Sequence, residues 1–129
     1  MEVIFLTRDD VLAIHTDELF HYGGSPGIHD EGLLDSALAM PAAGFGDQWL
    51  HPDVPSMAAA YLFHLVKNHP FVDGNKRVGA MTAFVFLKIN RLDLTLDEDA
   101  YEATVWSVAT DEIGKDELID LFRKSTMPR

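Results

Sequence analysis

The sequence contains no cysteine, which excludes disulfide bonds and thiolate metal sites and is compatible with a reducing compartment. It also lacks an uninterrupted apolar run near the roughly 20 residues that span a bilayer. The first residues lack the basic start and apolar core of a secretory signal. With 129 residues, of which 47% are hydrophobic, we expect one compact domain over residues 1–129, cytoplasmic and away from membranes.

Positive charge is scarce, and the net charge is −11. An acidic surface repels nucleic acid, so we expect no direct nucleic-acid partner. The few cations are nevertheless concentrated: residues 64–91 carry a net charge of +4, which leaves −15 for the rest of the chain. The cations of this segment are Lys67, Lys76, Arg77, Lys88 and Arg91, against Asp73 alone. A basic island in an acidic chain suits a small polyphosphate better than a duplex.

Apolar periodicity and capping residues predict an all-α fold with six helices. The expected helices run from Thr7 as N-cap to Gly23, from Asp30 as N-cap to Pro41, and over about 55–68, 75–90, 97–110 and 115–124. The fourth has apolar residues on every side, which predicts a central buried helix. Residues 41–55 read as an irregular loop, and residues 92–96 alternate like a strand that is too short and solitary for a sheet.

The most informative stretch is His-Pro-Phe-Val-Asp-Gly-Asn-Lys-Arg, residues 69–77. Histidine titrates near neutral pH, so His69 is the candidate general base for activating a hydroxyl. Asp73 offers a hard oxygen ligand for one coordination position of Mg²⁺.

The second half of this stretch predicts a phosphate site. Gly74 permits a tight turn, after which Asn75, Lys76 and Arg77 begin a helix whose free N–H groups attract phosphate oxygens. Lys76 adds a point charge and Arg77 a planar fork. The simpler reading is a glycine turn with ordinary surface cations, which would suffice for any one of these residues alone.

This stretch resembles the signature of the Fic family, His-Pro-Phe-x-Asp/Glu-Gly-Asn-Gly-Arg-x-x-Arg, and more closely its Doc (death-on-curing) branch, which has Asn-Lys-Arg. Residues 22–32 resemble the glycine-rich turn after the first helix of Doc proteins, and residues 108–113 resemble the segment that opens their last helices. The resemblance therefore runs from about Thr7 to the end and implies the six-helix Fic/Doc fold.

Two departures from the Fic signature bear on the reaction. Lys76 replaces a small residue, and Ala80 stands where enzymes that transfer AMP carry a second arginine. The Doc branch implies a kinase that uses ATP and Mg²⁺ and moves the γ-phosphoryl group to a hydroxyl of a translation elongation factor of the Tu type. AMP transfer, or a catalytically silent module that binds a partner, are the alternatives.

The resemblance also implies the toxin half of a toxin–antitoxin pair. Fic proteins are often restrained by a helix with Ser/Thr-x-x-x-Glu-Gly/Asn, and this pattern is absent from the sequence. Restraint is therefore expected in trans, from an antitoxin protein.

The glycine-rich turn has two readings. Its residues Gly23, Gly24, Ser25, Pro26 and Gly27 form either a plain connector or, as the resemblance implies, a loop that positions the target segment beside the active loop.

The remaining histidines do not suggest a metal site, because none forms an i, i+4 pair and His-Glu-x-x-His is missing. An adjacent His-Asp pair, such as His29–Asp30, is also found in all-α metal-dependent phosphohydrolases, which makes that class an alternative. The simpler reading is that Asp30 caps the second helix. Phe45 and Trp49 fit either a partner contact or the core, whereas Trp106 and Phe122, at helical spacing, are expected in the core.

Overall fold

In a computed structural model, described over residues 2–129, the chain is a helical protein with six helices and four very short strands. The all-α prediction is confirmed. The helices are α1 (Arg8–Tyr22), α2 (Glu31–Ala39), α3 (Val54–Asn68), α4 (Asn75–Ile89), α5 (Glu98–Ala109) and α6 (Lys115–Lys124). No helix within residues 2–129 is long and apolar enough to cross a membrane.

Side-chain caps explain why four helices begin where the sequence predicts. Thr7 and Asp30 accept hydrogen bonds from backbone N–H groups three residues later, as expected, and Asp53 and Asp97 do the same for α3 and α5. Each cap satisfies a donor that the helix itself leaves unpaired. The N-terminus of α4 is different, because Gly74 supplies no side chain there.

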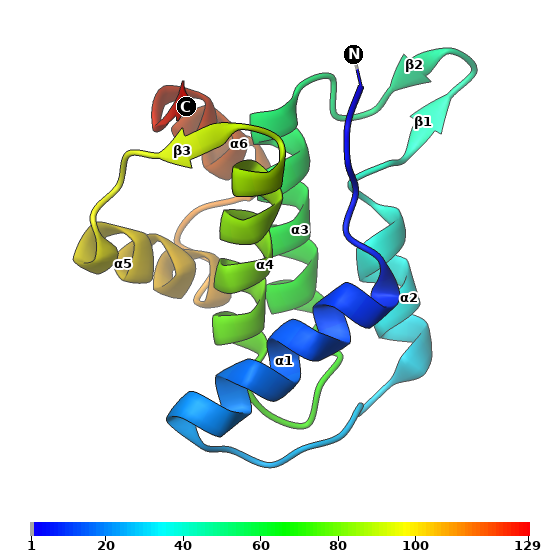
Figure 1. Ribbon diagram of the computed structural model, residues 1–129, viewed down its shortest axis with the longest axis vertical. Helices are drawn as coiled ribbons and strands as arrows, with labels where there is room; N and C mark the ends of the chain where they lie inside the picture. The colour runs from blue at the N-terminus through cyan, green and yellow to red at the C-terminus, as the bar shows by residue number, and fades with distance from the viewer. Residues whose placement is uncertain (1) are drawn as a thin grey trace.

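Helices α3 and α4 lie side by side at the centre of the molecule (Figure 1). Helix α1 crosses the lower end of this pair, α2 lies on one side of it, and α5 and α6 lie on the other side. The expected central position of α4 is therefore confirmed. Helix α3 is buried over an even longer stretch, from Ser56 to Leu62. The main core is formed mostly by these two helices, and α5 and α6 contribute Val105, Val108, Leu118 and Phe122.

Two small antiparallel strand pairs depart from the predictions. Leu92–Leu94 (β3) pairs antiparallel with Thr126–Pro128 (β4), so the segment thought solitary finds its partner at the C-terminal end of the chain. The expected irregular loop contains a hairpin, Gly44–Phe45 (β1) with Gln48–Trp49 (β2). Neither pairing is visible from local periodicity, because strands this short carry almost no pattern.

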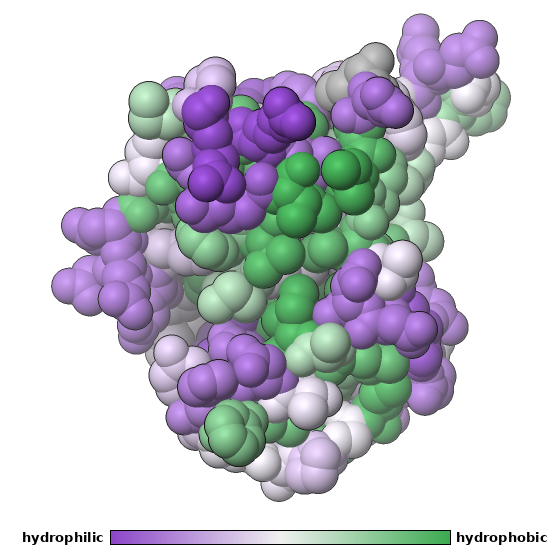
Figure 2. All heavy atoms as spheres, viewed as in Figure 1, coloured by the Kyte–Doolittle hydropathy of each residue, from purple (hydrophilic) through white to green (hydrophobic). Residues whose placement is uncertain are grey.

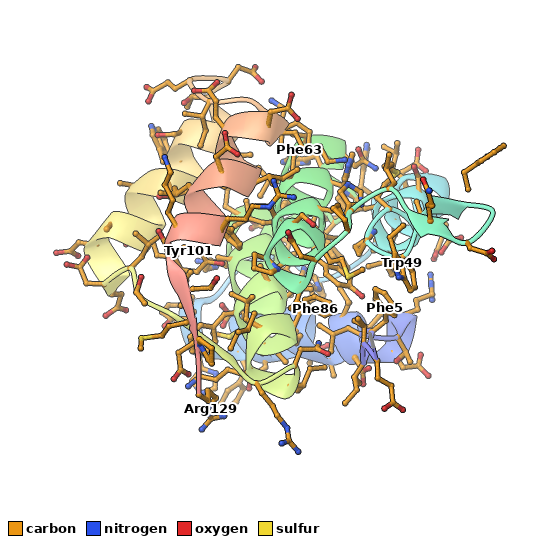
Figure 3. The ribbon with its side chains drawn as sticks, turned by 90° about the horizontal axis from the view of Figure 1, so that it is seen from above. Phe5, Trp49, Phe63, Phe86, Tyr101 and Arg129 are labelled. Carbon is orange, nitrogen blue, oxygen red and sulfur yellow. The ribbon has the colours of Figure 1, made fainter. Side chains whose placement is uncertain are left out.

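Aromatic contacts join the N-terminal segment to the β1–β2 hairpin and to the core. Phe5 lies between Trp49 and Phe86, with ring centroids 5.6 Å and 5.8 Å apart (Figure 3). Trp49 thus folds back against the N-terminal segment, while Phe45 stays 92% exposed. The core prediction holds for Phe122 and is wrong for Trp106, whose side chain is 57% exposed.

The two loops that the sequence marks as functional meet at one end of the helix pair. Residues 69–74 join α3 to α4, and residues 23–30 join α1 to α2; both lie at the lower end of Figure 1, away from the β1–β2 hairpin. Apolar surface gathers higher on the same face, and both polar and apolar residues cover the end that carries the loops (Figure 2).

Two histidines on the flank of α3 should make stability depend on pH. Burial lowers the pKa of His64 to about 4, helped by nearby Lys115 and His51, and burial also lowers the pKa of His51. The folded state then favours neutral rings, whereas the unfolded chain gains protons below about pH 6.5. The contribution of the neutral rings to the free energy of unfolding is therefore complete above about pH 6.5 and is lost as the pH drops towards 4. For His64 the loss is less than about 1.4 kcal/mol per pH unit.

Urea unfolding of the wild-type protein at pH 7 and pH 5 checks this expectation. His64→Leu should show a smaller difference between the two midpoints than wild type, whereas His29→Gln, at an exposed position, should not. An unchanged pH dependence in His64→Leu would show that this ring does not titrate on unfolding.

Candidate active site

His69 is displayed at the end of α3. It is the C-cap residue of that helix, has left-handed backbone angles (φ 51°, ψ 53°) and is exposed. A left-handed histidine is unusual, so the surrounding loop must hold it in place. Pro70 follows and ends the helix, as predicted. The imidazole therefore stands at the surface where a hydroxyl of another molecule has access to it.

Backbone hydrogen bonds pair the loop after His69 with the glycine-rich segment. The N–H of Val72 donates to the carbonyl of Gly27 at 3.0 Å, and the N–H of His29 donates to the carbonyl of Pro70 at 2.7 Å. Between them, Ile28 and Phe71 form an isolated antiparallel bridge. The two segments singled out from the sequence are thus one structural unit.

Asn75 locks the same loop from the other side. Its Oδ1 accepts from the N–H of Phe71 at 2.9 Å, and its Nδ2 donates to the carbonyl of Phe71 at 3.0 Å. The side chain is 4% exposed and faces inward. If Asn75 binds phosphate as predicted, its backbone N–H must do so, because the amide group is committed to the loop.

The N-terminus of α4 has the features of an anion site. Gly74 is its N-cap with φ 81°, and no side chain caps the first N–H groups of the helix. Uncapped N–H groups together with the helix dipole favour a negative ligand. The positive φ requires glycine, because a side chain in this conformation would be strained.

Arg77 leans from the first turn of α4 towards the end of α1. Its Nη2 donates to the carbonyl of Gly23 at 3.0 Å, and its guanidinium carbon lies 5.5 Å from the ring centre of Tyr22. Glu18, 6% exposed, lies within electrostatic range; burial and the neighbouring Asp17 raise the pKa of Glu18, and Arg77 opposes the shift. These contacts hold Arg77 beside the proposed phosphate cradle, by which we mean the N-terminus of α4 with Lys76 and Arg77.

Lys76 points to the opposite side of the same turn. Its Nζ lies 5.5 Å from the ring centre of Trp106 on α5. A lysine over an indole face gains a modest cation–π attraction. The two predicted phosphate cations therefore flank the helix N-terminus, each beside an exposed aromatic residue.

Asp73 is exposed and ionised at neutral pH. The N–H groups of Ser25 (to Oδ2, 3.2 Å) and Gly74 (to Oδ1, 2.9 Å) lower the pKa of its carboxyl group. Each carboxylate oxygen keeps a lone pair for a cation. No group of three metal-binding side chains occurs within residues 2–129, and the Mg²⁺ role of Asp73 stays a prediction.

The glycine-rich segment forms the wall beside Asp73. A Cβ on Gly24 would lie 3.0 Å from Oδ2 of Asp73 and 2.9 Å from Leu19, so only glycine fits this position at its φ of 121°. Pro26 and Gly27 line an open groove against α1, whose side is formed by Leu12, Thr16 and Phe20. A peptide segment of a target could lie in such a groove, and the target-positioning role of the glycine-rich segment stays a prediction.

His15 belongs to the site although no motif in the sequence marks it. Its side chain is 5% exposed, and its Nε2 lies 2.8 Å from the main-chain oxygen of Asp73. Its spacing is the signal that could have found it, since Val11, His15 and Glu18 share one buried face of α1. This face carries two polar residues, and Tyr22, near the end of the helix, is 65% exposed.

Asp30 is the N-cap of α2, and its Oδ1 accepts from the N–H of Leu33 at 3.0 Å. The carboxylate of Asp30 is thus engaged in capping α2, and no group of three metal-binding side chains occurs in the described part of the chain. The capping interpretation is the better one.

Comparison with known proteins agrees with this geometry. The family model described as "Fic/DOC family" matches residues 5–87, which include α1, α2, α3, most of α4 and both loops. The chain belongs to the Fic/Doc family. Within it, the chain is 40% identical over 99 residues to "Toxin Doc" of Mycolicibacterium smegmatis, covering 77% of this chain and 74% of that protein. It is 27% identical over 119 residues to "Protein kinase doc" of Escherichia phage P1, covering 92% and 93% of the two chains. The Fic/Doc match ends near the end of α4, and the alignment with the phage protein extends over most of the chain.

Proposed function

We propose that this protein is a toxin kinase that transfers the γ-phosphoryl group of ATP to a hydroxyl of a translation elongation factor of the Tu type and so blocks protein synthesis. The observation that carries the proposal is the arrangement of an exposed histidine, an ionised carboxylate and two cations around the uncapped start of α4. The relatives named as a toxin and as a protein kinase support it.

The γ-phosphoryl group passes from ATP to the acceptor in one displacement. His69 takes the proton of the acceptor hydroxyl as its oxygen forms a bond to the γ-phosphorus, and the bond from that phosphorus to the β–γ bridging oxygen breaks to release ADP. The N–H groups at the start of α4, with Lys76 and Arg77, stabilise the negative charge of the phosphates. Mg²⁺ held at Asp73 would neutralise phosphate charge and align the chain of phosphates.

The surroundings of Ala80 favour phosphoryl transfer over AMP transfer. Its side chain packs against the main core, and its carbonyl oxygen accepts from the Tyr101 hydroxyl at 2.6 Å, so α5 covers this position. Ala80 supplies no cation one turn beyond Arg77, where the AMP-transferring members of the family carry a second arginine. The cations are therefore confined to the first turn of α4, where Lys76 and Arg77 suit a γ-phosphate placed next to His69.

An antitoxin acting in trans is the other half of the proposal. It rests on the name of the mycobacterial relative and on the absence of the intramolecular inhibitory pattern from the sequence.

Position-specific labelling distinguishes the candidate reactions. We expect the protein, incubated with elongation factor Tu, Mg²⁺ and ATP, to transfer label from the γ-position to the factor and none from the α-position. Label from the α-position alone would refute the kinase and establish AMP transfer. Absence of both, with protein that still binds ATP, would contradict the proposed acceptor.

A further inference from the structure

The imidazole of His15 lies against the residues that precede α4. It stacks on the buried ring of Phe71, with centroids 3.9 Å apart and planes inclined by 13°. Its Nε2 lies 2.8 Å from the main-chain oxygen of Asp73 and would lie 3.6 Å from a Cβ on Gly74. Since a carbonyl oxygen only accepts hydrogen bonds, Nε2 is the donor. His15 is thus a polar ring from α1 inserted under the active loop.

The hydrogen bond from His15 clamps one peptide unit, the one that joins Asp73 to Gly74. The carbonyl oxygen of this unit accepts from His15, and its N–H donates to Oδ1 of Asp73 at 2.9 Å. Glycine imposes little restriction on backbone rotation, so without both contacts this peptide could turn. Rotation would carry the N–H away from the carboxylate and also change the turn at which α4 begins.

The neighbourhood shows that burial alone does not require a histidine here. Val11, Leu34 and Phe71 belong to the small core beside α1, and an aliphatic or aromatic side chain at position 15 would fill the same space. What only a donor supplies is the bond to the Asp73 carbonyl oxygen. The part-buried carbonyl oxygen would otherwise lack this partner, and an unpaired acceptor costs free energy to the extent that water cannot reach it.

We propose that His15 is a positioning residue that sets the direction of the Asp73 carboxylate and the geometry of the α4 N-terminus through the Asp73–Gly74 peptide. Its proposed action runs through this peptide unit, although the ring also lines the groove between α1 and the glycine-rich segment. The proposal rests on the proposed function in one respect, since it takes Asp73 as the Mg²⁺ ligand.

A matched pair of variants separates the hydrogen bond from the packing. Glutamine and methionine have similar length and flexibility, but only glutamine has a terminal N–H donor. In His15→Met we expect exchange of the Gly74 amide hydrogen, followed by ¹⁵N NMR, to accelerate about tenfold relative to the core amide of Leu62. The apparent affinity for Mg²⁺ in the presence of a non-hydrolysable ATP analogue, measured by calorimetry, should fall by about the same factor.

His15→Gln should restore most of both properties, and His21→Met, at an exposed position on the same helix, should leave both unchanged. If His15→Met does not fold, His15→Phe takes its place, because it keeps a ring for stacking on Phe71 and lacks the donor.

Three outcomes would overturn the proposal: unchanged Gly74 exchange in the apolar variant, equal acceleration at Gly74 and Leu62, or faster Gly74 exchange with unaltered Mg²⁺ affinity. Failure of the wild-type protein to bind Mg²⁺ and the ATP analogue would instead refute the proposed function. In that case the Gly74 exchange alone decides whether His15 positions the loop.

Discussion

Replacement of His69 should reduce transfer by about 10² to 10⁴-fold, the usual cost of losing a general base. His69→Asn is the sharper variant, because asparagine tolerates the left-handed backbone of this position better than alanine does and lacks a basic nitrogen. Folding and ATP binding should stay close to those of wild type, since the side chain is exposed and lies outside the helix N-terminus that is proposed to hold the phosphates.

The measurement is the initial rate of γ-label transfer at saturating ATP, together with calorimetric ATP affinity. His29→Ala is the matched control, because His29 is also exposed and also sits on the segment paired with the loop. Turnover by His69→Asn at the wild-type rate would remove His69 from the chemistry.

Helix positions were predictable from the sequence because their signals are local. Thr7 and Asp30 mark starts that the structure reproduces, and Gly23 marks the end of α1. Each of these signals depends on residues within one turn, so no knowledge of the tertiary structure is needed. The β3–β4 pairing was missed for the opposite reason: Thr126–Pro128 has no periodicity of its own and becomes a strand only through contact with β3.

The sequence predicts which residues form the candidate site better than it predicts the structural role of each residue. The motif identified which residues gather around the start of α4, because six of them are consecutive or nearly so. It did not reveal that Asn75 faces inward or that His15 supports the loop from α1. Those roles depend on which way a side chain points after packing, and a polar residue on a buried face reads from sequence as an exposed one.

Asn75→Ala should lower the free energy of unfolding by about 2 to 4 kcal/mol and abolish transfer. The substitution leaves the buried N–H and carbonyl of Phe71 without partners, and each unpaired group costs about 1 to 3 kcal/mol. Asn75→Asp should also lose transfer, because its second oxygen would face the carbonyl of Phe71 and its charge would sit at the proposed phosphate cradle.

Asn68→Ala is the matched control, since Asn68 makes one exposed hydrogen bond, from Nδ2 to the carbonyl of Leu33, at the end of the helix that precedes the loop. Its stability should fall by no more than about 1 kcal/mol, the worth of an ordinary hydrogen bond. Urea unfolding gives the two free energies and the labelling assay gives the rates. If Asn75→Ala were as stable as Asn68→Ala yet inactive, the amide would act on the nucleotide rather than on the loop. If it were destabilised as expected but retained full transfer, the rigid loop would be unnecessary for the chemistry, and the link drawn between Asn75, the ordered backbone of Phe71 and the placement of His69 would be wrong.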